Sequence, residues 1–376
     1  MNTRILLLIL FFITSFSCIA EQSQQQSDKA VFKQAYKQYK SAIADRDLLK
    51  AEIFAEQSLE LGKAIYSEKS IEIANLSMNY VQMFLLNQKG TVEDKQIKSK
   101  VLGLYELIIK NTETKYGKNS LELIDPYMGL GDVYNNKFKK YKKGLKYYQK
   151  ALKIAKSKKE TSALLYADLL LEVGRKIAIY SDKQKLTMRY IENAYDIYHE
   201  HLESNDKRVA DSAFWLGKLK LIDKKYRQSE KFFLEVMDIY EQADRLADES
   251  ALTTSAFLVK VYEKMGKRDK ANQYCRLIGE AKPWDENRDQ MPVYILEPRW
   301  PRSALINGQE GMVKIGFTID KNGFVKEPEI KDYSGSSKFK KAAIDAVEKW
   351  RFAPKYENGN PVDAVSTYTM EFKLAK

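Results

Sequence analysis

The chain has 376 residues, which is enough for two or three domains of ordinary size. Hydrophobic residues make up 44% of it and charged residues 30%, with 24 Tyr and 16 Phe, so a largely disordered or collagen-like chain is excluded. The net charge is +12, but only 2 His and 2 Cys are available for metal or nucleophilic chemistry. The composition therefore argues against an enzyme, and we expect no metal and no cofactor.

Residues 1–20 have the order of a secretory signal peptide. Arg4 precedes the apolar run Ile5–Ile13, and small residues lead to Ala20. The apolar stretch is shorter than the roughly 20 residues that span a bilayer as a helix. We expect cleavage after Ala20 and a periplasmic protein, with lipoprotein anchoring through an acylated Cys18 as the alternative. Export also argues against a nucleic-acid partner, despite the positive charge.

A repeat occupies the middle of the chain. Gly131, Gly174 and Gly217 are spaced at 43 residues within a similar apolar frame, and Val259 takes the same place 42 residues later. The regular period predicts a helical solenoid in which small residues let paired helices approach closely. Upstream, residues 69–73 echo residues 119–123 at an offset of 50, which predicts a repeat with an insert near residues 88–98. A further helical pair over residues 32–63 caps the array, so we expect about six pairs.

The Leu-Gly-x-x-Tyr frame at residues 130–134 resembles the tetratricopeptide repeat, in the 42-residue form found in kinesin light chains. HEAT and armadillo arrays have similar periods and stay open as alternatives. The resemblance implies an all-α domain over residues 21–283, whose concave groove holds a protein or peptide ligand.

Three features of the repeats invite a functional interpretation. Residues 137–159 hold eleven Lys and no acidic residue, which indicates either a solvated helix face with aromatic side chains in the groove or a patch that contacts an anionic membrane surface. His199 and His201 are two residues apart, so on a helix they point to different faces and do not predict a metal site. Cys275 occupies a frame position, which predicts a packed thiol rather than a nucleophile.

The pattern changes after Pro283. Residues 313–319 alternate between apolar and polar side chains, the period of a half-buried strand. Residues 320–323 have the sequence of a hairpin turn, and residues 324–333 return as a second strand. Apolar residues from Phe339 to Trp350 mark one face of a helix, and residues 365–374 form a last strand. The predicted order is strand, strand, helix, strand.

This order and its motifs resemble the C-terminal domain of the TonB family. The matching residues are Pro298-Arg299-Trp300-Pro301, Gly308-x-Glu310-Gly311, Asp320, Asn322-Gly323, Ser334-Gly335, Ala342-Ala343, Trp350-Arg351-Phe352-x-Pro354, Gly359-x-Pro361-Val362 and Phe372. We therefore expect an α+β two-domain protein. An all-α tetratricopeptide-like solenoid is followed, at residues 284–376, by a small TonB-type α+β domain with an antiparallel sheet and a helix.

The resemblance implies how partners are bound. A TonB-type domain grips a short extended segment of an outer-membrane receptor, the TonB box, by strand addition to a sheet edge. The positions that correspond in this chain are Glu297, Arg299 and Trp300 ahead of the sheet and Val365, Thr367 and Thr369 on the last strand. The alternative for Trp300 is that it only packs the start of the domain. The same edge also allows pairing with a second copy, which would make a homodimer.

The chain departs from an energy-transducing TonB protein, which keeps a transmembrane helix with a His and a long Pro-rich span. Here no His precedes His199, and only 8 Pro are scattered along the chain. We expect a transport component that binds outer-membrane receptors or TonB-system proteins, with a periplasmic interaction scaffold that has no role in energy transduction as the alternative. An enzyme is rejected, because no Gly-rich phosphate loop, nucleophile elbow or metal-ligand motif occurs.

Overall fold

The structure is a computed structural model, which describes residues 26–282, 284 and 290–374. The predicted signal peptide and Cys18 lie outside the described residues. The described residues divide into two compact units, one that ends at Leu169 and one that begins at Leu170. Among the described helices, none combines the length and the apolar character needed to cross a membrane.

The first unit consists of helices. A helix over residues 26–44 is followed by α2 (Leu48–Ile65), α3 (Ile71–Asn87), α4 (Lys95–Tyr116), α5 (Ile124–Asp132) and α6 (Tyr141–Ser157). The carboxylates of Asp47 and Asp94 and the hydroxyl of Ser70 cap the N-termini of α2, α4 and α3 by accepting N–H bonds, as such residues commonly do. The expected insert follows α3, and Val92 in it is buried.

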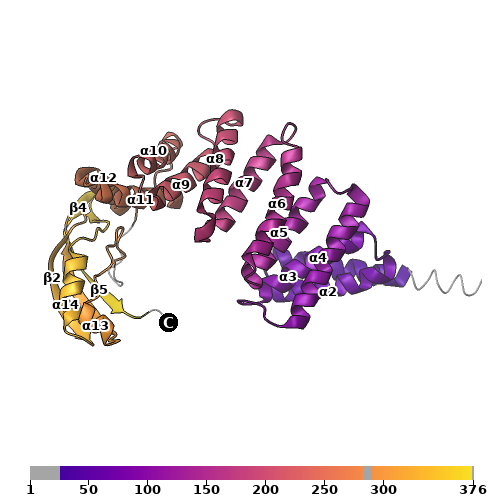
Figure 1. Ribbon diagram of the computed structural model, residues 1–376, viewed down its shortest axis with the longest axis horizontal. Coiled ribbons are helices and arrows are strands. Elements are labelled where there is room, and N and C mark those ends of the chain that lie inside the picture. The colour runs from indigo at the N-terminus through magenta and orange to yellow at the C-terminus, as the bar shows by residue number, and fades with distance from the viewer. Residues whose placement is uncertain (1–25, 283, 285–289, 375–376) are drawn as a thin grey trace, which may run out of the picture. The chain divides into compact units, whose positions relative to one another are not determined.

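The helical pattern continues through the second unit. Helix α7 (Ala163–Ile177) crosses the division between the units, and α8 (Gln184–His201), α9 (Lys207–Ile222), α10 (Tyr226–Gln242), α11 (Glu249–Met265) and α12 (Arg268–Ala281) follow. From α8 to α12, each helix packs against the next (Figure 1). The described residues therefore contain six helical pairs, which confirms the predicted repeat array.

The frame glycines allow the close approach that the repeat predicts. A Cβ atom at Gly131 would lie 2.4 Å from the ring of Tyr148, and one at Gly217 would lie 2.6 Å from the ring of Phe233. Both rings are fully buried. Ser229 adds a link across the same pair, because its Oγ donates to Gly217 O at 2.8 Å. Small residues on one helix and large residues on the other therefore set the spacing of each pair.

The C-terminal domain has the predicted order of strand, strand, helix, strand. It contains β1 (Gly311–Ile319), β2 (Val325–Ser334), α14 (Lys338–Val347) and β5 (Ala364–Phe372), with the antiparallel sheet order β2-β1-β5. Apolar side chains of β1 and α14 form the core of the domain. Helix α14 packs against β1 and β2 of the sheet (Figure 1). The short helix α13 (Arg302–Ile306) and the hairpin of β3 (Lys355–Glu357) and β4 (Asn360–Val362) were not predicted.

Arg351 joins the last helical pair to this domain. Its side chain is 2% exposed and forms an ion pair with Glu263 of α11, whose side chain is 12% exposed. Its Nη2 also donates to Asn272 Oδ1 of α12 (2.6 Å) and to Asn322 O (2.7 Å). The last helical pair and the C-terminal domain both belong to the unit that begins at Leu170. A boundary after residue 283, and independent folding on either side of it, stay predictions.

Candidate functional site

Strand β5 lies at an edge of the sheet. It pairs with β1 over nine residues without a register shift, from Ala364 opposite Ile319 to Phe372 opposite Gly311. On its other side β5 pairs with no strand of the described residues. Its side chains alternate, so that Met370 and Phe372 are buried in the core while Val365 is 79% exposed.

The direction of the main chain along β1 follows from two hydrogen bonds. The N–H of Asp320 donates to Phe324 O (2.9 Å) in the hairpin between β1 and β2, so the main chain of Asp320 faces β2. The main-chain N–H and C=O groups of successive residues point to opposite sides of a strand. Met312, also even-numbered, accordingly donates its N–H to Ser334 Oγ of β2 (3.2 Å). Even-numbered residues of β1 therefore face β2, and odd-numbered residues face β5.

The register then fixes the direction of the main chain along β5. The odd-numbered residues of β1 pair with even-numbered residues of β5, as Phe317 does with Ser366. The main chain of the odd-numbered β5 residues is therefore directed to the open side. The predicted contact residues Val365, Thr367 and Thr369 all belong to this set.

The opposite edge, β2, is built differently. Its register with β1 shifts at two places, Glu327 has φ 49°, and Pro328 carries no N–H. Charged side chains supply half of the strand: Lys326, Glu327, Glu329, Lys331 and Asp332. Bulges, proline and charges are the features by which proteins prevent pairing at a sheet edge. Because β5 has none of them between Val365 and Met370, it is the edge suited to accept another strand.

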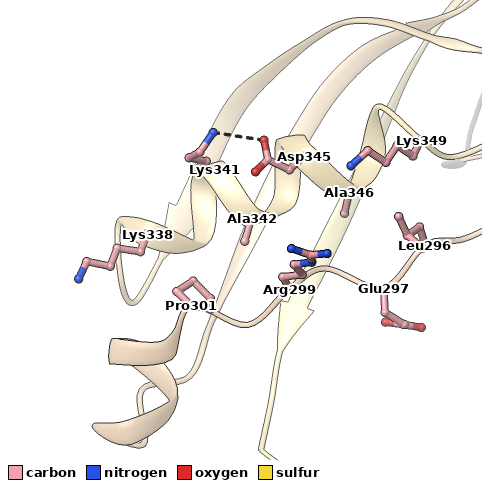
Figure 2. Close-up of a pocket in the computed structure, with 10 residues that line it drawn as sticks. All are labelled: Leu296, Glu297, Arg299, Pro301, Lys338, Lys341, Ala342, Asp345, Ala346 and Lys349. Atoms are coloured by element: carbon pink, nitrogen blue, oxygen red, sulfur yellow. Dashed lines mark hydrogen bonds and ion pairs between the residues drawn. The ribbon is translucent and has the colours of Figure 1, made fainter.

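Ahead of the sheet, residues 294–301 form a lead-in segment that borders α14. The segment and the helix enclose a cavity of about 570 Å³. Figure 2 shows Arg299 extending toward α14, while Glu297 points away from the helix. The helix side contributes Lys338, Lys341, Asp345 and Lys349, of which Lys341 and Asp345 pair at 3.4 Å. Positive charge is therefore in excess around the cavity.

Trp300 packs into the domain core. Its ring makes edge contacts with Phe339 (5.7 Å between centroids) and Phe372 (5.6 Å). Trp350 holds the same segment, because its Nε1 donates to Leu296 O at 2.9 Å. The structure thus brings Glu297 and Arg299 together at the cavity and gives Trp300 a packing role, which is the alternative considered for it.

The cavity lysines were missed in the sequence, although a signal was present. Lys338, Lys341 and Asp345 follow the spacing i, i+3, i+7, which places them on one face of α14, and Lys349 lies in the turn just after the helix. The apolar face of the same helix predicts the core, and its polar face lines the cavity.

Lysines 139–159 are exposed and form no ion pair with a described residue. Lys150 lies over the rings of Tyr127 and Tyr147, 5.0 and 5.1 Å from their centroids. Tyr148 is fully buried against the repeat frame. Phe138 is buried as well, whereas Tyr141 is 41% exposed, so only part of the aromatic residues of this stretch pack in the repeat as predicted. Contact with an anionic membrane surface stays a prediction.

Each of the two histidines lies near a glutamate, and the one described cysteine is buried. His199 Nε2 lies 2.8 Å from Glu235, whereas His201 lies 3.8 Å from Glu200. The part of the chain that the structure describes contains no cluster of three or more potential metal ligands. Cys275 is fully buried, and burial raises its thiol pKa to about 12. The packed thiol is confirmed.

The C-terminal part of the chain is similar to a known protein family. Residues 297–374 match the family model described as Gram-negative bacterial TonB protein C-terminal. Protein TonB of Pseudomonas aeruginosa is 33% identical over 88 residues, which are 23% of this chain and 26% of that protein. Protein TonB of Vibrio cholerae is 30% identical over 79 residues, which are 21% of this chain and 32% of that protein. The chain thus spans about a quarter to a third of the length of these relatives.

Two solved structures resemble different parts of the chain. The solution structure of the Pseudomonas aeruginosa TonB C-terminal domain is 32% identical and covers 24% of this chain and 92% of its own, with a TM-score of 0.21. A structure of a kinesin light chain with tetratricopeptide-like repeats from Podosopora anserina is 13% identical and covers 55% of this chain and 92% of its own, with a TM-score of 0.42. Residues 297–374 thus match the TonB C-terminal family, and in this chain they follow an array of helical repeats.

Proposed function

We propose that the protein is a periplasmic TonB-family protein that takes part in TonB-dependent transport across the outer membrane. Strand β5 accepts an extended segment of an outer-membrane receptor or of a TonB-system protein, and the repeat groove holds a second protein or peptide. The match of residues 297–374 to the TonB family supports the transport role. The observation that carries the binding mode is the contrast between β5, with an unbroken register and no charge from Val365 to Met370, and the charged, irregular edge β2.

Strand addition makes a prediction about affinity. The added segment is held mainly through main-chain hydrogen bonds, and each contributes only about 0.5–1.5 kcal/mol net. Val365 and Thr369 direct their main chain away from β1. Binding to a few such residues is modest in strength and tolerates changes of side chain as long as the main-chain groups remain.

The test compares two substitutions at Thr369 in the full chain. In Thr369→Pro the N–H is lost and the ring obstructs the open side, so binding of peptides with receptor TonB-box sequences should weaken about tenfold or more, equivalent to about 1.4 kcal/mol. Thr369→Val keeps the N–H and the branched shape, and should change affinity less than about twofold. Calorimetry measures both. A folded Thr369→Pro protein that binds as tightly as the parent would rule out strand addition at β5.

The second candidate function is a periplasmic scaffold with no part in energy transduction. It is favoured if the parent protein binds none of these peptides. In either case the exposed lysines of residues 139–159 suit peripheral contact with an anionic membrane surface. The open edge of β5 also suits pairing with a second copy, which sedimentation of the full chain would detect.

A further inference from the structure

A basic residue recurs at one position of the repeat frame. Arg175 on α7, Lys218 on α9 and Lys260 on α11 each directly follow the frame residue, which is Gly174, Gly217 or Val259. All three belong to the first helix of a pair in successive repeats. Equivalent residues of neighbouring repeats lie side by side in such an array, so the three cations form a ladder along the first helices.

Each of the first two cations lies over an aromatic ring of the next repeat. The guanidinium of Arg175 is 5.5 Å from the ring centre of Trp215 on α9, and Nζ of Lys218 is 5.6 Å from that of Phe257 on α11. Trp215 and Phe257 both stand two residues before the frame position. Lys218 also lies 4.0 Å from the ring centre of Trp215. The same cation and aromatic arrangement is thus built twice, one repeat apart.

The cations of this ladder lack acidic partners, whereas their neighbours have them. Arg175 and Lys218 form no ion pair with any described residue. Close by, Lys176 pairs with Glu172 (3.3 Å) and Lys220 with Glu192 (2.9 Å). Burial lowers the pKa of Lys218, and the positive charge of Arg175 lowers it further. The two cations therefore repel each other without compensation, and an incoming anion would relieve that repulsion.

A cavity of about 380 Å³ opens beside these groups. Arg175, Phe214 and Trp215 line one part of it, and Thr253 and Thr254 of α11 line another. Its two acidic residues are Glu249 and Asp211, and Asp211 pairs with Lys207 at 3.5 Å. The cavity therefore offers an aromatic wall for an apolar side chain next to cations that are free to pair with carboxylates.

From this geometry we infer that the groove along α7, α9 and α11 binds an acidic segment of a partner protein. Carboxylates of the segment pair with Arg175 and Lys218, and an apolar side chain between them enters the cavity against Trp215. This inference deepens the proposed repeat-groove function by naming the chemistry of the ligand. A second copy of the chain is a poor occupant on grounds of charge, because the protein carries +12.

The test uses the full chain and two fluorescein-labelled peptides, followed by anisotropy. One peptide has twelve residues rich in Glu with interspersed Leu, and the other has Gln in place of every Glu. The acidic peptide should bind, and the Gln peptide should bind at least tenfold more weakly. The double variant Arg175→Gln/Lys218→Gln should weaken binding of the acidic peptide at least tenfold. The matched control Lys33→Gln/Lys37→Gln removes the same charge from exposed positions of the helix over residues 26–44 and should change binding less than twofold.

Three results would overturn the inference. Equal binding of both peptides to the parent protein would show that carboxylates are not recognised, and this comparison does not depend on the folding of any variant. An equal loss of acidic-peptide binding in the control variant would show that binding depends only on the overall positive charge of the protein. Binding of phosphatidylglycerol vesicles, but not of the acidic peptide, through Arg175 and Lys218 would identify a lipid surface instead. Because the β5 test uses different peptides, failure here leaves strand addition unaffected.

Discussion

The substitution Glu263→Gln probes the contact between the helices and the sheet. Glu263 carries the only carboxylate among the described residues that pairs with Arg351. The amide keeps the size of the side chain but removes its charge, so the guanidinium of Arg351 stays buried with only the neutral acceptors Asn272 Oδ1 and Asn322 O. We expect this change to destabilise the unit that begins at Leu170 without altering its fold.

The burial of the Glu263 and Arg351 side chains determines how much stability Glu263→Gln should lose. Removing one partner of a buried ion pair costs about 3–5 kcal/mol, because the other charge is left without compensation. For a unit of roughly 200 residues, each kcal/mol lowers Tm by about 2–4 °C, so the expected fall in Tm is on the order of 10 °C. The additional variant Arg351→Met removes the stranded charge, and Glu263→Gln/Arg351→Met should be less destabilised than the sum of the single changes.

The assay is thermal unfolding of the full chain, followed by tryptophan fluorescence, because Trp300 and Trp350 both pack in the C-terminal core. Asp345→Asn is the matched control, since it breaks the Lys341–Asp345 pair, whose side chains are 84% and 53% exposed. Such an exposed pair contributes at most about 1 kcal/mol. The reasoning fails if Glu263→Gln lowers the free energy of unfolding no more than Asp345→Asn does.

The frame glycines, the buried thiol and the N-terminus can each be tested separately. Gly217→Ala should destabilise the repeats by about 1–3 kcal/mol in denaturant unfolding, because its methyl group meets the ring of Phe233, whereas Gly103→Ala, which meets nothing within 4 Å, should be neutral or stabilising by up to about 1 kcal/mol. Since Cys275 is fully buried and burial raises the pKa of its thiol, iodoacetamide should label the native protein only after unfolding. Mass spectrometry of protein from its native host should find Glu21 as the first residue, and a diacylated Cys18 would contradict that expectation.

The fold of the C-terminal domain was predictable because its signals are local. Alternation over residues 313–319 and the turn at 320–323 specify a hairpin within one short stretch, and the structure has it there. The hairpin of β3 and β4 was not predictable in the same way. Its strands have three residues each, which is too short for any periodic pattern to appear.

The candidate sites were also predictable only in part from the sequence. The edge position of β5 was predicted from family resemblance, but the outward direction of its odd-numbered residues required the hydrogen bonds and the register. Arg351 could not be singled out, because its partner Glu263 lies 88 residues earlier in the sequence. Among 114 charged residues, no local pattern marks the one that will be buried. The ladder of Arg175, Lys218 and Lys260 can be recognised in the repeat frame of the sequence. That Arg175 and Lys218 have no acidic partner among the described residues is known only from the structure.

The position of Arg351 has a mechanical consequence for any peptide that is pulled while attached to β5. Tension along such a peptide acts parallel to the strand, so the nine-residue pairing of β5 with β1 is loaded in shear and its bonds resist together. Backwards along the chain, β5 leads through the hairpin of β4 and β3 to Arg351, whose guanidinium is held by α11 and α12. Force applied at the sheet edge therefore passes into the last helical pair through a buried ionic contact, and the helices share the strain with the sheet.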